Sequence, residues 1–160
     1  MFSNLTNPRR KARIIALQAL YEVDSSKHSP SKVLERLLQE KPLSEDLAAF
    51  ACDLVEGVIR NKLRIDKIIE SFAPTFPIDQ IAIVDRNLLR LAIFEVLFDN
   101  KVPVKVAINE AVEMAKIFGS DSSRRFVNGV LGSVVAHYLK NDETKRPINI
   151  QDQDSKCQLY

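Results

Sequence analysis

The stretch NPRRKARIIALQALYEV, residues 7–23, decides the fold class because its apolar side chains recur at steps of three and four residues. This spacing places them on one face of an α-helix. Asn7 is a residue type that caps helix N-termini and Pro8 suits the first helical position, so we expect the helix to begin there. The expected buried stripe comprises Ala12, Ile15, Ala16, Ala19, Leu20 and Val23.

The rest of the chain repeats this helical spacing, and no alternation of apolar and polar residues is long enough to predict a strand. Ser29-Pro30 and Ser44 are expected to begin the second and third helices. Four later helices are expected over about residues 62–72, 79–98, 104–118 and 122–139. Gly119 fits the end of the sixth helix, and Ser120 or Asp121 fits the N-cap of the seventh.

Pro74 and Pro77 interrupt the helical pattern and predict a boundary between two lobes, at about residues 8–75 and 78–140. About seven helices with short connections predict an all-α fold of two small antiparallel helical bundles. Residues 1–7 are expected to be a flexible N-terminus, and the polar, aperiodic residues 141–160 a disordered tail.

Composition narrows the class of protein. Hydrophobic residues make up 46% of the 160 residues and charged residues 28%, as in soluble globular domains. No apolar run approaches the roughly 18 residues of a transmembrane helix, so we expect a cytoplasmic protein without membrane contact. Two cysteines build neither a disulfide framework nor a zinc cluster. No GxxxxGKS/T, GxGxxG, HExxH or CxxC motif occurs, so no cofactor, metal site or catalytic residue is expected.

Glu95 is a carboxylate within the apolar stripe of the fifth predicted helix. A lone buried carboxylate is costly unless it is paired or hydrogen bonded. We expect it to accept backbone N–H groups from the turn around residues 104–106. A catalytic role would need a partner acid or base, and the sequence nominates none.

Three glycines, Gly57, Gly129 and Gly132, lie within helical patterns, where each costs about 1 kcal/mol relative to alanine. Close packing of helices is the expected reason. Close approach of a ligand backbone is the alternative.

Positive charge is concentrated at the start of the first helix. The net charge of the chain is +2, yet residues 1–21 contain four Lys or Arg residues and no Asp or Glu. A helix N-terminus carries about +0.5 elementary charge, so cations there are unfavourable by about 0.3 to 1 kcal/mol each. A bound anion would reverse the sign of this penalty. The four cations are Arg9, Arg10, Lys11 and Arg13.

At about 100° per residue, Arg10, Lys11, Gln18 and Tyr21 share one outward arc of the helix, with Arg9 and Arg13 beside the buried stripe in the first turns. This face offers cations for phosphates, an amide for a base edge and an aromatic ring for stacking, which are the groups that bind single-stranded RNA. A solvated polar face is the alternative. Arg124-Arg125-Phe126 repeats the pairing of cation and aromatic, although Phe126 also suits the core.

Three segments carry a resemblance to a known family. RRKARIIALQALYEV, VDRNLLRLAIFEVLF and above all VPVKVAINEAVEMAKIFGSDSSRRFVNGVLGSVV, residues 102–135, closely resemble the NusB family of transcription antitermination factors. The likeness spans about residues 8–140. It implies an all-helical, non-catalytic protein that binds boxA RNA together with NusE, a small-subunit ribosomal protein. With other Nus factors, the complex would act on the elongating RNA polymerase, notably on ribosomal RNA operons.

Carried over by position, the resemblance assigns RNA binding to the N-terminal helix, to an acidic position and to a base-stacking aromatic. These residues are Arg9, Arg10, Lys11, Arg13, Gln18, Tyr21, Asp85, Arg125 and Phe126. Two positions depart from the family pattern, because Val104 stands where a tyrosine is frequent and Ser122 where an aspartate can stand. Replacing an acid near RNA reduces repulsion of phosphate.

Two other functions remain open at this point. NusB-like domains also precede the catalytic domains of ribosomal RNA methyltransferases, although this chain has no residues left for such a domain. The chain also fits a helical module that binds only protein or forms a homodimer.

Overall fold

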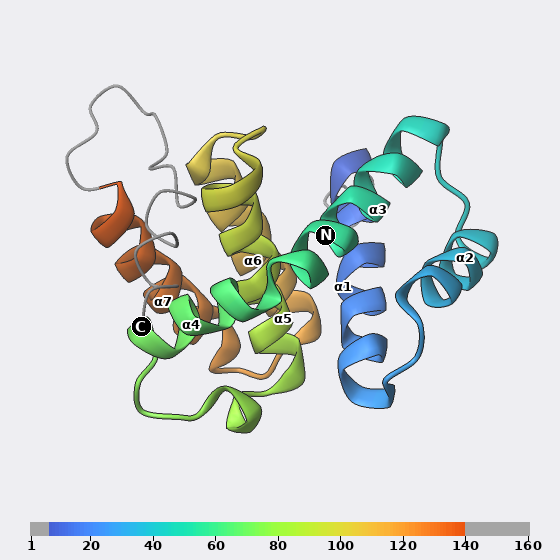
Figure 1. The fold of residues 1–160 in the computed structure, drawn as a ribbon. Coiled ribbons are helices and arrows are strands. Elements are labelled where there is room, and N and C mark those ends of the chain that lie inside the picture. Colours follow the sequence, from blue (N-terminus) through green and yellow to red (C-terminus); the bar gives the residue numbers. More distant parts are fainter. Residues whose placement is uncertain (1–6, 140–160) are drawn as a thin grey trace, which may run out of the picture.

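The computed structural model describes residues 7–139 and shows seven α-helices with short connections (Figure 1). No strand occurs among these residues, so the all-α prediction is confirmed. Residues 1–6 of the predicted flexible N-terminus (1–7) and the predicted tail 141–160 lie outside the described residues, whereas Asn7 caps α1. In chain order the elements are α1 (Pro8–Ser26), α2 (Pro30–Glu40), α3 (Glu45–Arg60), α4 (Lys62–Phe72), η2 (Ile78–Gln80), α5 (Ile83–Ile93), η3 (Phe94–Asp99), α6 (Val104–Phe118) and α7 (Ser123–Tyr138).

Helix α1 is the centre of the first bundle. It packs against α2 and α3 and also against α5 of the second bundle. Residues buried on α1 cover an arc of about 220° at 100° per residue, far wider than the stripe predicted from spacing. A helix with neighbours on three sides buries more than one face. The wider buried arc includes Arg10 and Arg13, which the prediction placed outside the buried stripe.

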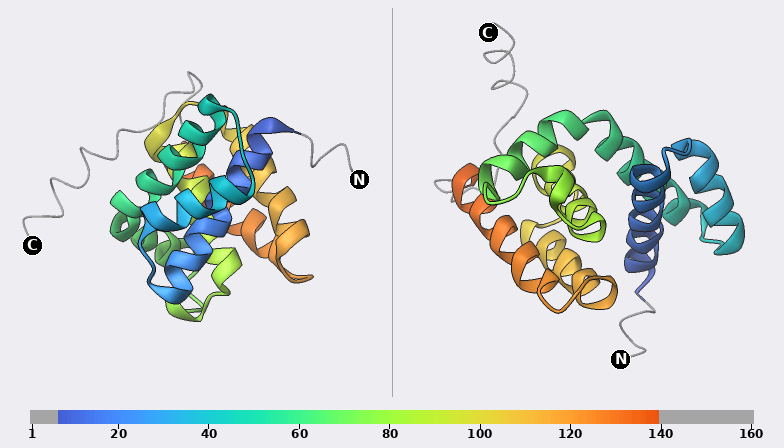
Figure 2. Two further views of the ribbon diagram at one scale, coloured as in Figure 1. Left: turned by 90° about the vertical axis from the view of Figure 1, so that its right-hand side faces the viewer. Right: turned by 90° about the horizontal axis from the view of Figure 1, so that it is seen from below.

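The second bundle contains α4, α5, α6 and α7. Helix α4 contacts α5 and α7, although it precedes Pro74 and Pro77. Figures 1 and 2 show α1, α2 and α3 on one side of the molecule and the other helices on the opposite side. The packing therefore divides between α3 and α4, whereas the sequence placed the boundary at the prolines.

The predicted fifth helix is interrupted. A 3-10 turn (η2), extended residues Ile81 and Ala82, α5 and a π-helix (η3) replace the continuous helix expected over 79–98. The Arg86 guanidinium satisfies backbone carbonyls at the break, because its Nη1 donates to the carbonyls of Asp79 and Ile81 at 3.2 Å each. Arg86 thereby stabilises the irregular backbone that leads into α5.

Gly57 confirms the close packing expected of a helical glycine. A Cβ atom built on Gly57 would lie 2.0 Å from Cζ of Phe94, so η3 approaches α3 too closely for any side chain. The same expectation is wrong for Gly129 and Gly132, where a Cβ would meet nothing within 4 Å. Both glycines lie on an exposed face of α7.

Cap residues explain most of the other helix bounds. Asn7, Ser29 and Ser44 occupy the predicted N-caps, and Gly119 ends α6 as predicted. The N-cap of α7 is Ser122, so the prediction of Ser120 or Asp121 is wrong by one or two residues.

Candidate nucleic-acid interface

The N-terminus of α1 combines a capped helix end with four cations. Asn7 Oδ1 accepts the backbone N–H groups of Arg9 and Arg10 at 3.1 and 3.4 Å. No acidic residue lies in the first turn. The positive end of the helix therefore carries positive side chains, and their directions decide which of them can meet an anion.

Arg10 points into the protein, which corrects the outward position predicted from the helical arc. Its Nε and Nη2 donate to the two carboxylate oxygens of Glu110 on α6, both at 2.8 Å. Only 6% of Arg10 and 8% of Glu110 are exposed. The hydrogen bonds from Arg10 hold the pKa of Glu110 below its usual value, although burial acts in the opposite direction.

Arg13 is also internal, which corrects its predicted position beside the buried stripe, because only 2% of the residue is exposed. Its Nη2 donates to Oε1 of Glu95 at 2.9 Å and its Nε donates to Oε2 at 3.0 Å. Glu95 therefore accepts from an arginine, and the prediction that it accepts backbone N–H groups near residue 104 is wrong. Two of the four cations thus join α1 to α6 and η3.

The inward positions of Arg10 and Arg13 have one physical cause. The buried arc of α1 extends to include Arg10 and Arg13, because α5 and the elements after it cover a second side of the helix. Buried guanidinium groups need paired acceptors, and Glu110 and Glu95 supply them.

Arg9 and Lys11 are the cations of α1 that face solvent. The structure of residues 7–139 gives neither an ion pair. The Arg9 guanidinium lies over the Phe50 ring, 5.0 Å from its centroid, which holds the side chain beside α3 without neutralising its charge. Gln18 is half-buried and Tyr21 is 42% exposed on the same helix.

The remaining site predictions lie on α5 and α7. Arg124 and Arg125 are exposed at the start of α7, whereas Phe126 is half-buried and packs against the core. Asp85 is only 8% exposed in the first turn of α5, and its Oδ1 has no hydrogen-bond partner among the described residues. Its burial leaves little surface for a direct RNA contact.

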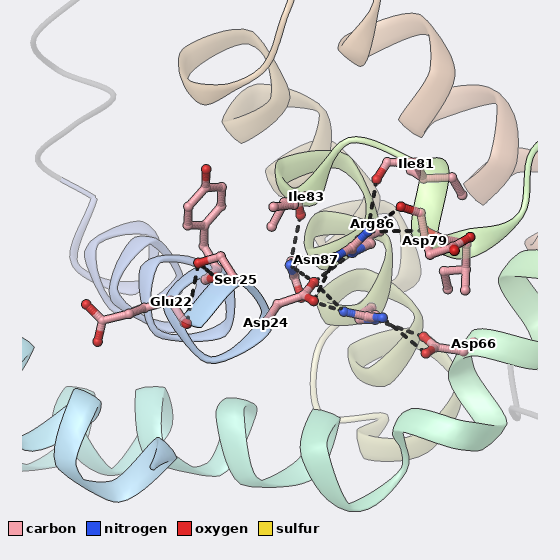
Figure 3. Close-up of polar contacts among 12 residues, drawn as sticks. Glu22, Asp24, Ser25, Asp66, Asp79, Ile81, Ile83, Arg86 and Asn87 are labelled. Atoms are coloured by element: carbon pink, nitrogen blue, oxygen red, sulfur yellow. Dashed lines mark hydrogen bonds and ion pairs between the residues drawn. The ribbon is translucent and has the colours of Figure 1, made fainter. Parts of the chain in front are cut away.

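An ion-pair network between the bundles escaped the sequence analysis. The Asp24 carboxylate of α1 accepts from Arg86 at 2.7 Å through each of Nε and Nη2, and from Asn87 and Arg90 at 2.9 Å (Figure 3). Arg90 also donates to Asp66 on α4. Burial acts to raise the pKa of Asp24, but these donors outweigh it and hold the pKa well below its usual range. This network fixes the far end of α1 against α4 and α5.

The described part of the chain contains neither a metal-binding cluster nor a membrane-spanning helix. Residues 7–139 contain no group of three or more His, Cys, Asp or Glu residues arranged to hold a metal ion. No helix in this range is both long and apolar enough to cross a membrane.

Comparison with known proteins identifies the family. A profile described as the NusB family matches residues 10–136. The chain belongs to the NusB family. The Transcription antitermination protein NusB of Dehalococcoides mccartyi strain 195 is 53% identical over 130 residues, which are 81% of this chain and 91% of that protein. The protein of the same description from Chloroflexus aggregans is 50% identical over 141 residues, 87% of this chain and 94% of that protein.

Solved structures of the NusB family share the fold. T. maritima NusB superposes with a TM-score of 0.75 at 32% identity, covering 80% of this chain and 90% of that one. A chain from a crystal structure of antitermination factors NusB and NusE in complex with double-stranded RNA gives a TM-score of 0.77 at 29% identity. The match covers 83% of this chain and 99% of that chain. The NusB family match spans both bundles, so the outward face of α1 and the start of α7 both belong to the shared fold.

Proposed function

We propose that this antitermination protein binds boxA-type single-stranded RNA of nascent transcripts, notably ribosomal ones, together with NusE. The observation that carries the proposal is the position of Arg9 and Lys11. Both face solvent at the positive end of α1, and neither has an ion-pair partner within residues 7–139. Arg9 and Lys11 project from opposite sides of the helix, so they would contact separate phosphates near the positive end of the helix dipole, and this binding would remove the electrostatic cost of the cations.

The other proposed contacts follow from exposure. Gln18 would bond a polar RNA edge, Tyr21 would stack on a base, and Arg125 would contact phosphate from the start of α7. Phe126 is half-buried, so it would contribute only the part of its ring that the core leaves exposed. Arg10 and Arg13 are not among the proposed phosphate contacts, because each already pairs with a buried glutamate. Asp85 is buried, so its proposed effect on RNA binding would be indirect.

The partners are proposed from the family. The neighbouring structure that contains NusB, NusE and RNA supports NusE and RNA as partners of this chain. We place the assembled complex, with other Nus factors, on the elongating RNA polymerase, where it would oppose termination. No catalytic step is part of this function, and no cofactor is needed for it.

The test is a titration of fluorescent boxA RNA with the full chain, with and without NusE, beside a scrambled RNA of equal length and composition. We expect tighter binding of boxA than of the scrambled RNA and a further gain with NusE. Equal binding of both RNAs in both conditions would overturn the proposal. Binding of NusE without RNA binding would favour the module that contacts protein only.

A further inference from the structure

A hollow of about 320 Å³ lies between the end of α1, the starts of α2 and α4, and α5. Its volume falls within the range of about 300 to 1,000 Å³ that is typical of small-ligand sites. Val23, Val58 and Ile59 form an apolar part of its wall. Lys27, which also lines it, is displaced from Lys11 by about 24 Å along the axis of α1 and about 160° around it. The hollow is therefore separate from the proposed phosphate contacts at the start of α1.

The side chains that line the hollow give it a net positive charge. Lys27, Lys62 and Arg90 supply three cations, and Asp24 supplies one carboxylate. With His28 counted as neutral, the lining carries a net charge of +2. Asp24 already accepts hydrogen bonds from three side chains of α5 (Figure 3), so little of it is left to neutralise the lysines.

The two lysines are the unpaired cations of this hollow. Arg90 is shared between Asp24 and Asp66, whereas neither Lys27 nor Lys62 has an ion-pair partner within residues 7–139. Lys27 ends α1 in the left-handed backbone conformation, with φ 62°. The negative end of α1 stabilises its charge. Lys62 has the opposite relationship to its own helix.

Lys62 lies at the positive end of α4. It is the first residue of that helix, and the first turn contains no acidic residue. The side-chain amide of Asn61 donates to the carbonyl of Gly57 at 2.8 Å and does not cap α4. A cation is unfavourable at this end, and a bound anion would reverse the sign of the interaction. The same relationship supports the proposed phosphate contacts of α1.

The start of α2 brings a second helix N-terminus to the hollow. Ser29 and Pro30 line it, and the first turn of α2 contains no acidic residue. The Ser29 hydroxyl lies 3.1 Å from the hydroxyl of Ser31 and makes no capping hydrogen bond. The first backbone N–H groups of α2 therefore lack a side-chain cap, as those of α4 do. Two such helix ends and two unpaired lysines meet at one hollow.

We propose that this hollow binds a phosphate group, with Lys27 and Lys62 as its charged contacts and the starts of α2 and α4 as sources of backbone N–H donors. The apolar part of the wall suits the organic portion of a phosphate ester. The site is independent of RNA binding at the start of α1. Free phosphate compounds and the RNA backbone both carry this group, and two separate titrations distinguish them.

The first titration adds pyrophosphate to the full chain labelled with ¹⁵N, at an ionic strength held constant with sodium chloride. We expect saturable shifts of the amide signals of Lys27, Ser31 and Lys62. Each hydrogen bond to a charged group is worth roughly tenfold in affinity, so Lys27→Ala/Lys62→Ala should weaken binding at least tenfold. Arg60→Ala/Lys67→Ala is the matched control, because it removes the same charge from exposed positions of α3 and α4 outside the hollow. It should change the affinity less than threefold.

A conservative variant separates loss of charge from loss of fold. Lys27→Arg/Lys62→Arg keeps both charges and should retain most of the affinity for pyrophosphate. Circular dichroism and thermal unfolding check that each variant is folded. Shifts that do not saturate, or equal weakening by the two alanine double variants, would show that pyrophosphate responds only to the net charge of the chain. Either result would overturn the inference.

The second titration identifies the source of the phosphate. It compares boxA RNA with an RNA extended on both sides of boxA. If pyrophosphate binds and Lys27→Ala/Lys62→Ala keeps its affinity and salt slope for both RNAs, the source is a free phosphate compound. A salt slope that is lower by about 0.7 to 1.4 for the extended RNA alone would identify RNA phosphate instead. Loss of the preference for boxA would refute the proposed function and leave the pyrophosphate result standing, whereas absence of pyrophosphate binding would refute this site alone.

Discussion

Arg13 of α1 and Glu95 of η3 form a bidentate ion pair in the interior, with 3% of each side chain exposed. Arg10 and Glu110 form a second pair of the same kind, with 8% and 11% of the side chains exposed. Together they connect the first helix to two elements of the other bundle. The four cations at the start of α1 therefore form two groups. Arg10 and Arg13 hold the bundles together, whereas Arg9 and Lys11 face solvent.

Breaking the inner pair should destabilise the fold strongly. Arg13→Met leaves Glu95 as an uncompensated buried charge, so we expect a loss of about 3–5 kcal/mol in the free energy of unfolding. Urea denaturation measures it. The double variant Arg13→Met/Glu95→Leu removes both charges and should lose much less. Equal losses in the single and double variants would contradict this explanation.

Removing the shared acceptor of the Asp24 network should be similarly costly. Asp24→Ala leaves Arg86 and Arg90 without this carboxylate, so we expect a loss of about 3–5 kcal/mol. Asp53→Ala is the control, because Asp53 is an exposed aspartate on α3 and its loss should stay within about 0.5 kcal/mol.

The same carboxylate predicts an acid dependence of stability. Because the folded pKa of Asp24 lies below the unfolded value, its contribution is complete above about pH 4 and is lost as the pH falls through the lower folded pKa. Unfolding curves between pH 6 and pH 2.5 should show a decline in stability that is smaller in Asp24→Ala. An identical decline in both proteins would assign it to other carboxylates.

The two kinds of helical glycine should respond to alanine with opposite signs. At Gly57 the new Cβ would collide with the Phe94 ring, so we expect Gly57→Ala to lose about 1–3 kcal/mol. At Gly129 or Gly132 the Cβ enters open space, so alanine should add about 0.5–1 kcal/mol through helix propensity. Thermal unfolding of the three variants checks this, and a stabilised Gly57→Ala would refute the packing argument.

Local signals predicted much of the fold. The start of α2 at Pro30 and the bounds of α4 and α6 agree with those predicted from apolar spacing and from the proline and glycine at the helix ends, because these signals act over one or two turns. The positions of Arg10 and Arg13 were missed for the opposite reason. Their partners are 100 and 82 residues away in the chain, and a helical arc does not show how many neighbours a helix has. Exposed Lys11 and Tyr21 were placed correctly, because the predicted outward arc and the observed exposed arc overlap there.

The last prediction separates the outward cations from the inward ones. Arg9→Ala/Lys11→Ala should stay folded, bind boxA RNA more weakly, and reduce the steepness of log affinity against log salt by about 1 to 1.4, because each phosphate contact on a single strand contributes about 0.7. Titrations at several salt concentrations measure the slope. Arg60→Ala/Lys67→Ala removes the same charge from exposed positions on α3 and α4 and should keep most of the slope. Equal slopes for both double variants would mean that the basic start of α1 acts only through net charge, and the proposed phosphate contacts would then be wrong.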